Sequence, residues 1–363
     1  MHAKRGSLPV LAAILIAAAP AFSLPASAAP SASFSLTDAL GRKVAFDRAP
    51  QRIAMTGKAL FMIADAAYLF PEAASRIAAI GNIVQGERGF IPAIDSSYGR
   101  KMILESLAGP EQIAAANPDA VILKSGLAGG LGKSIEALGV PVVYVDFETP
   151  QQFERDLATL GKLFQDEKRA KELAAAFRER ENNVAAALSG IEEGKKPSVL
   201  LLYYSDQGGA VSFNVPPLGW MQTTLVKMGG GRPAWESAQI GQGWTKVTIE
   251  QVATWNPDQI YVVSYSRKVS DALGKLRSDP QWSALRAVKS GALFGFPGDY
   301  YSWDQPDPRW ILGLEWIASK LHPDRFVGVD MRHEIRAFYK DFYAIDEAAY
   351  KKIIEPFLSG DLP

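Results

Sequence analysis

Aromatic side chains gather in predicted loops of the second half of the sequence, where they could hold a large ligand. Trp220 and Trp244 each stand in a glycine-containing loop, and Tyr300, Tyr301 and Trp303 crowd a third one. A single aromatic residue in a turn more often packs over the core than contacts a ligand. Five such residues at the same strand ends favour ligand contact. Rigid, flat side chains suit a large, partly apolar ligand such as a metal chelate or a corrin. The sequence therefore predicts an aromatic ligand site.

Cationic side chains in other predicted loops could meet an anionic ligand. Lys58, Arg88 and Arg267 are such residues, and Lys58 follows Thr56-Gly57 directly before a predicted helix. Free backbone N–H groups at a helix start favour anions. The same holds for the glycine-rich stretch SGLAGGLG, which begins at Ser125. These features keep a small oxyanion open as an alternative ligand.

The composition argues against most kinds of enzyme. The 363 residues contain no cysteine and three histidines, of which only His322 and His333 follow the predicted export signal. Cysteine nucleophiles and thiolate metal sites are excluded, and zinc hydrolases and Ser-His-Asp triads are hard to build. Asp299 and Asp304 could still do acid–base work, although nothing in the sequence pairs them. We expect a protein that is not an enzyme and has no catalytic residue, cofactor or metal ion of its own.

The N-terminus predicts export. Basic residues open the chain, an apolar stretch runs from Leu8 to Ala19, and Ala26-Ser27-Ala28 forms a cleavage site. The apolar stretch is too short to span a bilayer comfortably, so residues 1–28 are interpreted as a cleaved signal peptide rather than a membrane anchor. Lys+Arg and Asp+Glu both number 39, which implies no nucleic-acid partner. We expect a monomer, free in a bacterial periplasm.

Two stretches of the chain, 29–150 and 197–363, each predict an α/β lobe. A β-hairpin is expected at 34–47. Further strands are expected at 52–55, 77–81, 120–124 and 140–146, and then at 199–204, 259–264 and 292–296. Strands that alternate with helices favour parallel sheets. Residues 151–196 place leucines at helical spacing and contain no strand, which predicts one long linking helix.

The predicted fold class is therefore α/β: two Rossmann-like lobes with parallel sheets, joined by one long α-helix and followed by a helical C-terminus. In open α/β sheets, ligands bind beyond the carboxyl ends of the strands. With two lobes, those ends face each other across a cleft. This arrangement would bring together the candidate ligand contacts, which are Lys58, Arg88, Ser125, Trp220, Trp244, Arg267, Tyr301 and Trp303.

One fifteen-residue segment occurs twice, once in each predicted lobe. EQIAAANPDAVILKS begins at Glu111 and EQVATWNPDQIYVVS begins at Glu250, with seven positions identical. In both copies a short helix opens with an acid, where negative charge is favoured. Asn-Pro then ends the helix, because the residue before proline avoids the α region. Such a connection can recur by chance, but two copies in matching places favour a duplicated-lobe architecture.

Over nearly all of the mature chain, the sequence resembles the iron-siderophore and cobalamin class of periplasmic substrate-binding proteins, which serve ABC importers. The resemblance is carried by the order and spacing of LAGPEQIAAANPDAVI, MQTTLVKMGGGRP, WTKVTIEQVATWNPDQIYVV and PDPRWILGLEWIASKLHPDRF, with a long helix between the lobes. It implies capture of a metal complex, such as a ferric siderophore or cobalamin, and delivery to a membrane permease dimer with its ATPase. It also implies that the loops at Trp220, Trp244 and Tyr301–Trp303 line the ligand cleft.

The resemblance also implies a role for the repeat. In this family each lobe presents one acidic residue, at the start of this helix, to an arginine pocket on the permease. By position, those residues are Glu111 and Glu250. An acid at a helix start can serve the helix alone, but two that are placed symmetrically fit a two-subunit permease better.

Other ligands and functions stay open. Some proteins that resemble this class carry molybdate or tungstate, which would suit Lys58 and the glycine-rich turns. Haem would need His322 or His333, or a tyrosine such as Tyr98 or Tyr204, as its axial ligand. A secreted sensor domain and a carboxylate-dependent enzyme are the alternatives of another class.

Overall fold

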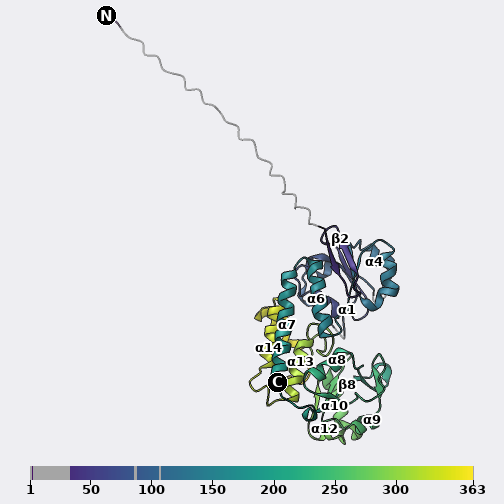
Figure 1. The fold of residues 1–363 in the computed structure, drawn as a ribbon, viewed down its shortest axis with the longest axis vertical. Coiled ribbons are helices and arrows are strands. Elements are labelled where there is room, and N and C mark those ends of the chain that lie inside the picture. Colours follow the sequence, from purple (N-terminus) through teal and green to yellow (C-terminus); the bar gives the residue numbers. More distant parts are fainter. Residues whose placement is uncertain (1, 3–32, 86–87, 106–107, 363) are drawn as a thin grey trace.

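The protein consists of two α/β lobes with a helical layer along one side (Figure 1). The computed structural model describes residue 2 and residues 33–85, 88–105 and 108–362, so the predicted signal peptide lies outside the described residues except for His2. The long helices α7 (Glu167–Ala187) and α14 (Met331–Tyr343) belong to the helical layer. The predicted fold class, two α/β lobes with a long helix, is confirmed.

The N-terminal lobe is built on a parallel sheet with the strand order β5-β4-β3-β6-β7. Its central strand β3 is apolar and fully buried on both faces, as strands covered by helices on two sides must be. The predicted hairpin is present, and it caps one edge of the sheet because Ala39 N–H donates to the carbonyl of Tyr144 at 2.9 Å. The strands are β1 Phe34–Thr37, β2 Lys43–Phe46, β3 Ile53–Met55, β4 Ile77–Ile80, β5 Met102–Ile103, β6 Ala120–Lys124 and β7 Val142–Val145. The helices are α1 Leu60–Ala67, α2 Ala73–Arg76, α3 Phe90–Ile94, α4 Pro110–Ala115 and α5 Lys133–Glu136.

The C-terminal lobe has a mixed sheet in the order β11-β9-β8-β12-β13, with β10 also paired to β8. β8, β12 and β13 are parallel as predicted, but β9 is antiparallel to β8. The turn between β8 and β9 is too short for a crossover, and so it can only form a hairpin. The strands are β8 Ser198–Ser205, β9 Ser212–Val215, β10 Arg232–Pro233, β11 Thr245–Val247, β12 Gln259–Val263 and β13 Leu293–Gly295. The helices are α8 Met221–Met228, α9 Ile249–Trp255, α10 Val269–Ser278, α11 Pro280–Ser283, α12 Arg286–Lys289, α13 Trp310–Leu321, α14 Met331–Tyr343 and α15 Glu347–Ile353.

The segment predicted as one linking helix contains two helices, α6 (Pro150–Phe164) and α7. The break falls at Gln165, which has a left-handed φ of 60°, and at Asp166, whose side chain accepts the Arg169 N–H of α7. The two helices touch closely at Gly161, where an added Cβ would lie 2.4 Å from the Cβ of Ala170. α6 packs against the N-terminal lobe through Thr159, and α7 carries the chain on toward the C-terminal lobe.

Phe177 of α7 joins the packing of both lobes. Its ring stacks on Trp310 of α13, with centroids 5.8 Å apart, and on Phe342 of α14 at 4.9 Å. Phe153 of α6 approaches it from the N-terminal lobe at 4.7 Å. One buried apolar cluster therefore runs from β3 in the N-terminal lobe to β8 in the C-terminal lobe. Separating the lobes would expose this surface to water, which opposes large lobe movements.

The repeated segment folds in the same way in both lobes. After α4 and α9, Asn117 and Asn256 adopt left-handed φ values of 47° and 44°. Asparagine tolerates this conformation better than most residues, which explains why both copies use it. Glu111 and Glu250 are each the second residue of their helix, and both are exposed.

The aspartate of each copy holds the neighbouring strand. Asp119 accepts the backbone N–H groups of Gln51 and Arg52 ahead of β3, at 2.8 and 2.9 Å. Asp258 accepts the N–H of Ser198 at the start of β8, at 2.7 Å. The shared asparagine, proline and aspartate thus form a turn that ends the helix, starts the next strand and aligns that strand with the adjacent strand of the sheet.

Candidate functional site

Four aromatic side chains meet near the carboxyl ends of parallel strands in the C-terminal lobe. These residues, which we call the aromatic cluster, are Tyr203, Trp220, Trp244 and Tyr265. Tyr203 lies near the end of β8, Tyr265 follows β12, Trp220 caps α8 and Trp244 precedes β11. The Tyr203 ring lies 5.0 Å from Trp244 and 4.7 Å from Tyr265, and Trp220 meets Trp244 edge-on at 5.7 Å. All four are half-buried. The cluster therefore keeps aromatic surface available for a ligand.

A buried carboxylate supports the cluster from inside the lobe. Asp304 is 0% exposed and accepts hydrogen bonds from the Tyr265 hydroxyl at 2.5 Å and from Gln222 Nε2 at 3.2 Å. Burial raises the pKa of Asp304 to about 6, although these hydrogen bonds oppose the shift.

On the N-terminal lobe, the turn after β3 and the turn after β6 touch each other. Gly57 has a φ of 119°, and a Cβ there would lie 2.7 Å from the side chain of Leu127, so this close approach requires glycine. Lys58 is exposed next to it, and none of the ion pairs among the described residues involves it. Ser125 donates to Asp146 and Lys124 pairs with Glu148, so these two side chains are already held within their lobe.

The glycine-rich stretch after Ser125 is helical rather than the turn predicted. A 3-10 turn, Ser125–Leu127, runs into a π-helical turn, Ala128–Gly132, before α5 begins. A Cβ on Gly132 would overlap the hydroxyl of Tyr144, which explains that glycine. Single π-helical turns occur often at functional sites, and this one adjoins the turn that carries Lys58.

Tyr301 lies between the lobes. Its ring stacks on Phe61 of α1 at 4.3 Å, and its hydroxyl donates to the carbonyl of Ile83 at 2.6 Å. Close by, Gln85 and Gln305 exchange two hydrogen bonds, at 2.9 and 2.8 Å. Strand ends of one lobe therefore face the 298–309 loop of the other, as predicted from the sheet topology.

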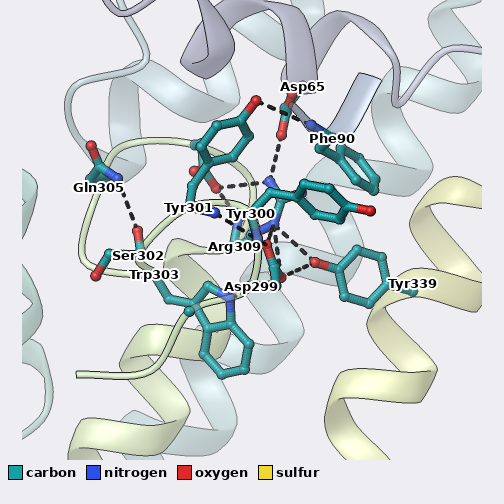
Figure 2. Close-up of polar contacts among 12 residues, drawn as sticks. Asp65, Phe90, Asp299, Tyr300, Tyr301, Ser302, Trp303, Gln305, Arg309 and Tyr339 are labelled. Carbon is teal, nitrogen blue, oxygen red and sulfur yellow. Dashed lines mark hydrogen bonds and ion pairs between the residues drawn. The ribbon is translucent and has the colours of Figure 1, made fainter. Parts of the chain in front are cut away.

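A buried guanidinium ties this loop to the N-terminal lobe, as Figure 2 shows. Arg309 pairs with Asp65 of α1 at 2.5 Å, with Asp299 at 2.9 Å and with Asp307 at 3.5 Å. It also donates to the Tyr339 hydroxyl of α14 at 2.9 Å. All four charged side chains are 0% exposed. We call Asp65, Asp299, Asp307, Arg309 and Tyr339 the Arg309 hub, which links α1, the 298–309 loop and α14.

Three carboxylates surround one guanidinium in the hub, so full ionisation would bury excess negative charge. Burial raises the pKa of Asp65 to about 7 and that of Asp307 to about 8, even though Arg309 opposes both shifts. Within the described part of the chain, Asp65 Oδ1, Asp307 Oδ2 and Arg309 Nη2 have no hydrogen-bond partner. The hub therefore holds protons at neutral pH.

Raising the pH from about 5 to about 8 should lower the free energy of unfolding. The ordinary pKa of an aspartate is 3.8, so Asp65 and Asp307 bind protons more tightly in the folded chain than in the unfolded chain. Their contribution is complete below the ordinary value and is lost as the pH rises through the raised values, by up to about 1.4 kcal/mol per group and pH unit. Urea denaturation across this range measures the loss. Asp307→Asn needs no proton and should flatten the dependence, whereas an unchanged slope in this variant would contradict the assignment.

Three further predicted contacts have partners of their own within the protein. Trp303 is 0% exposed and donates to Asp299 at 3.1 Å. Arg267 is exposed and pairs with Asp206 at 2.8 Å. Arg88 is exposed, with its guanidinium 5.2 Å from the ring of Phe357.

Sequence reasoning missed several members of the site. Tyr203 and Tyr265 are absent from the predicted contacts, although a tyrosine near the end of one strand and another directly after the next is a recognisable signal. The hub residues Asp65 and Arg309 were missed too, because they stand 244 positions apart. Within the described residues, no group of three or more histidine, aspartate or glutamate side chains could hold a metal ion.

Two α/β lobes that face each other are typical of solute-binding proteins, and comparisons with known proteins agree. The pattern of the periplasmic binding protein family matches residues 100–300, more than half of the chain. The chain belongs to this family. Among the described residues, none of the helices combines the length and apolarity needed to cross a membrane.

Individual relatives differ in their ligands. The molybdate-binding protein MolA of Haemophilus influenzae is 26% identical over 267 residues, covering 66% of this chain and 73% of MolA. The molybdate-bound MolA structure has a TM-score of 0.70 at 20% identity, over 86% of this chain and 98% of MolA. The TroA-like protein FepB of Veillonella parvula has a TM-score of 0.70 at 18% identity, over 85% of this chain and 95% of FepB. CeuE of Helicobacter pylori, in a complex with nickel and histidine, has a TM-score of 0.66 at 18% identity, over 89% of this chain and 99% of CeuE.

These findings confirm the family expected from the sequence. The chain is a periplasmic substrate-binding protein of an ABC transporter, a class whose members bind solutes rather than catalyse reactions.

Proposed function

We propose that this chain captures a metal complex, such as a ferric siderophore or cobalamin, between its lobes and delivers it to a membrane permease. The aromatic cluster carries the proposal: four half-buried rings stand together at strand ends. Flat aromatic faces gain most from contact with a large, partly apolar ligand, and they lose little conformational entropy when it binds.

The contacts that we propose come from both lobes. Trp220 and Trp244 provide aromatic faces from the C-terminal lobe, and Lys58 faces an anionic part of the complex from the N-terminal lobe. We also propose Ser125, Arg88 and Arg267 as polar contacts of the ligand. Tyr301 and Trp303 are buried, so we assign them to the support of the site rather than to its surface.

The docking proposal rests on Glu111 and Glu250. Both are exposed at matching positions of the repeat. α4 and α9 lie on the side of the molecule away from α7 and α14 (Figure 1). A glutamate is already charged at neutral pH, and the Thr248 side chain lowers the pKa of Glu250 further. We propose that each glutamate contacts one subunit of the permease dimer.

A second candidate ligand is molybdate or tungstate. The observation that favours it is the similarity to MolA, together with an exposed lysine beside a strained glycine turn. A small oxyanion would be held by Lys58 and backbone N–H groups rather than by the aromatic cluster.

Trp244→Ala should raise the Kd for a metal complex about 10- to 100-fold, a loss of about 1.4 to 2.8 kcal/mol. Removing this ring opens the centre of the aromatic cluster, which it joins to Trp220, Tyr203 and Tyr265. Titration of tryptophan fluorescence with ferric siderophores of several types, cobalamin, haem, molybdate and tungstate measures the change.

Trp255→Ala is the matched control, since Trp255 is also half-buried but lies on α9. It should leave the Kd within about twofold of wild type, a difference below 0.5 kcal/mol. Saturable binding of an oxyanion alone, unaffected by Trp244→Ala, would favour the second candidate and reject the metal complex.

A further inference from the structure

Asp304 is a buried acid that accepts a hydrogen bond from the aromatic cluster and has no cationic partner among the described residues. Its carboxylate is 0% exposed, and the ion pairs among the described residues do not include it. Three donors face it instead: the Tyr265 hydroxyl at 2.5 Å, the Ser302 hydroxyl at 2.5 Å and Gln222 Nε2 at 3.2 Å. A buried charge costs free energy unless it is well hydrogen-bonded, so these three donors are what allows the Asp304 carboxylate to be ionised inside the lobe.

The three donors come from separate elements. Tyr265 follows β12 and belongs to the aromatic cluster. Gln222 lies in the first turn of α8, two residues after Trp220, and Ser302 belongs to the 298–309 loop. Asp304 therefore fixes Tyr265 relative to the helix that Trp220 caps. The next residue of the loop, Gln305, bonds to Gln85 of the other lobe.

The three hydrogen bonds favour the ionised form of Asp304, because a carboxylate accepts from all three groups. All three partners donate, and a carboxylate has acceptor sites for each of them. A protonated carboxyl would itself donate from one oxygen, so the hydroxyl that faces this oxygen would have to turn and accept instead. The titratable side chain that faces Asp304 is Tyr265, and Tyr203 in turn faces Tyr265. Asp299 and Asp307 of the same loop pair with Arg309 instead.

We propose that Asp304 is a positioning residue of the ligand site, whose ionised carboxylate holds Tyr265 and the Trp220 end of α8 in the arrangement that binds ligand. This proposal rests on the proposed function, in that the aromatic cluster is taken as the ligand surface. On this proposal, the shape of the aromatic cluster depends on the charge of Asp304, although Asp304 itself does not touch the ligand.

The test compares Asp304→Asn and Tyr265→Phe with wild type, and Asp271→Asn serves as the control because Asp271 is exposed on α10. In the ligand-free protein, tryptophan emission and its quenching by iodide are followed between about pH 4.5 and pH 8, a range that spans the titration of a moderately shifted carboxyl. Wild type and Asp271→Asn should show a transition near pH 6 that Asp304→Asn lacks, whereas a change at about pH 7 to 8 from the Arg309 hub should remain in all three proteins. A transition near pH 6 that persists unchanged in Asp304→Asn would overturn the proposal, whether or not any ligand is known.

The second part of the test measures the Kd of the metal complex that binds wild type most tightly among the ligands titrated by tryptophan fluorescence. Asp304→Asn and Tyr265→Phe should each raise its Kd at least about tenfold at pH 7.5, while Asp271→Asn stays within about twofold. Wild type itself should lose affinity below pH 6 and Asp304→Asn should not, a pH profile that a merely structural role would not produce. A Kd within about twofold of wild type in both variants would overturn the positioning role. If none of these ligands binds, the proposed function fails, and the ligand-free part of the test still decides the role of Asp304.

Discussion

Replacing Arg309 with methionine should cost about 3 to 5 kcal/mol of folding free energy at pH 7.5, the largest effect of any substitution considered. The side chain is 0% exposed and holds Asp65, Asp299 and Asp307. Methionine fills much of the volume but leaves three buried carboxylates without their cation. The loss should be smaller at pH 5, because protonation of Asp65 and Asp307 then removes the excess charge. Urea denaturation at both pH values measures the difference.

The matched control is Arg178→Met. Arg178 pairs with Glu154 at 3.1 Å, but both side chains are about half exposed, at 56% and 47%. Such a pair contributes less than about 1 kcal/mol, so this variant should lose little at either pH. An equal loss at pH 5 and pH 7.5 for Arg309→Met would mean that the hub acts through packing alone.

Reversing the charge of both docking residues, Glu111→Lys with Glu250→Lys, should reduce uptake through the permease at least about tenfold, because like charges across an interface cost several kcal/mol. The Kd for ligand should stay at the wild-type value, since both residues are exposed at helix starts outside the proposed ligand contacts. Uptake in cells that lack the wild-type protein, together with titration of the purified variant, measures the two quantities separately.

Glu167→Lys tests whether any acidic helix start has this effect. Glu167 is also exposed in the first turn of its helix, but α7 belongs to the helical layer on the other side of the molecule. This control should transport normally. Normal transport by the double variant with unchanged ligand binding would reject the docking role.

Most of the fold could be predicted because it depends on local sequence patterns. Alternating apolar strands and helices identify both sheets, and the Asn-Pro-Asp repeat marks the same turn in each lobe. The break between α6 and α7 could not be predicted, because Gln165 adopts a left-handed φ of 60° where glycine or asparagine would have been a signal. The antiparallel strand β9 was not predicted either, because Ser212–Val215 is only four residues long and carries a weak alternating pattern.

The site could be predicted only in part. Loop tryptophans such as Trp220 and Trp244 stand out in the sequence, and the structure brings them together. Tyr301 and Trp303 carry the same signal, but the structure buries both of them, because an aromatic residue in a loop can equally fill the contact between two lobes. The Arg309 hub could not be predicted from the sequence, because it depends on contacts between distant segments. Periodicity and motif spacing give no information on such contacts.

The most direct test of the central claim is to locate the bound metal. Crystals of the protein with the ferric complex that binds most tightly would be measured at the iron absorption edge, so that the anomalous signal marks the metal. We expect one peak between the aromatic cluster and the turn that carries Lys58, which is lost in Trp244→Ala crystals treated in the same way. A peak elsewhere on the molecule, or a peak between the lobes that Trp244→Ala leaves in place, would contradict the assignment of the aromatic cluster as the ligand site.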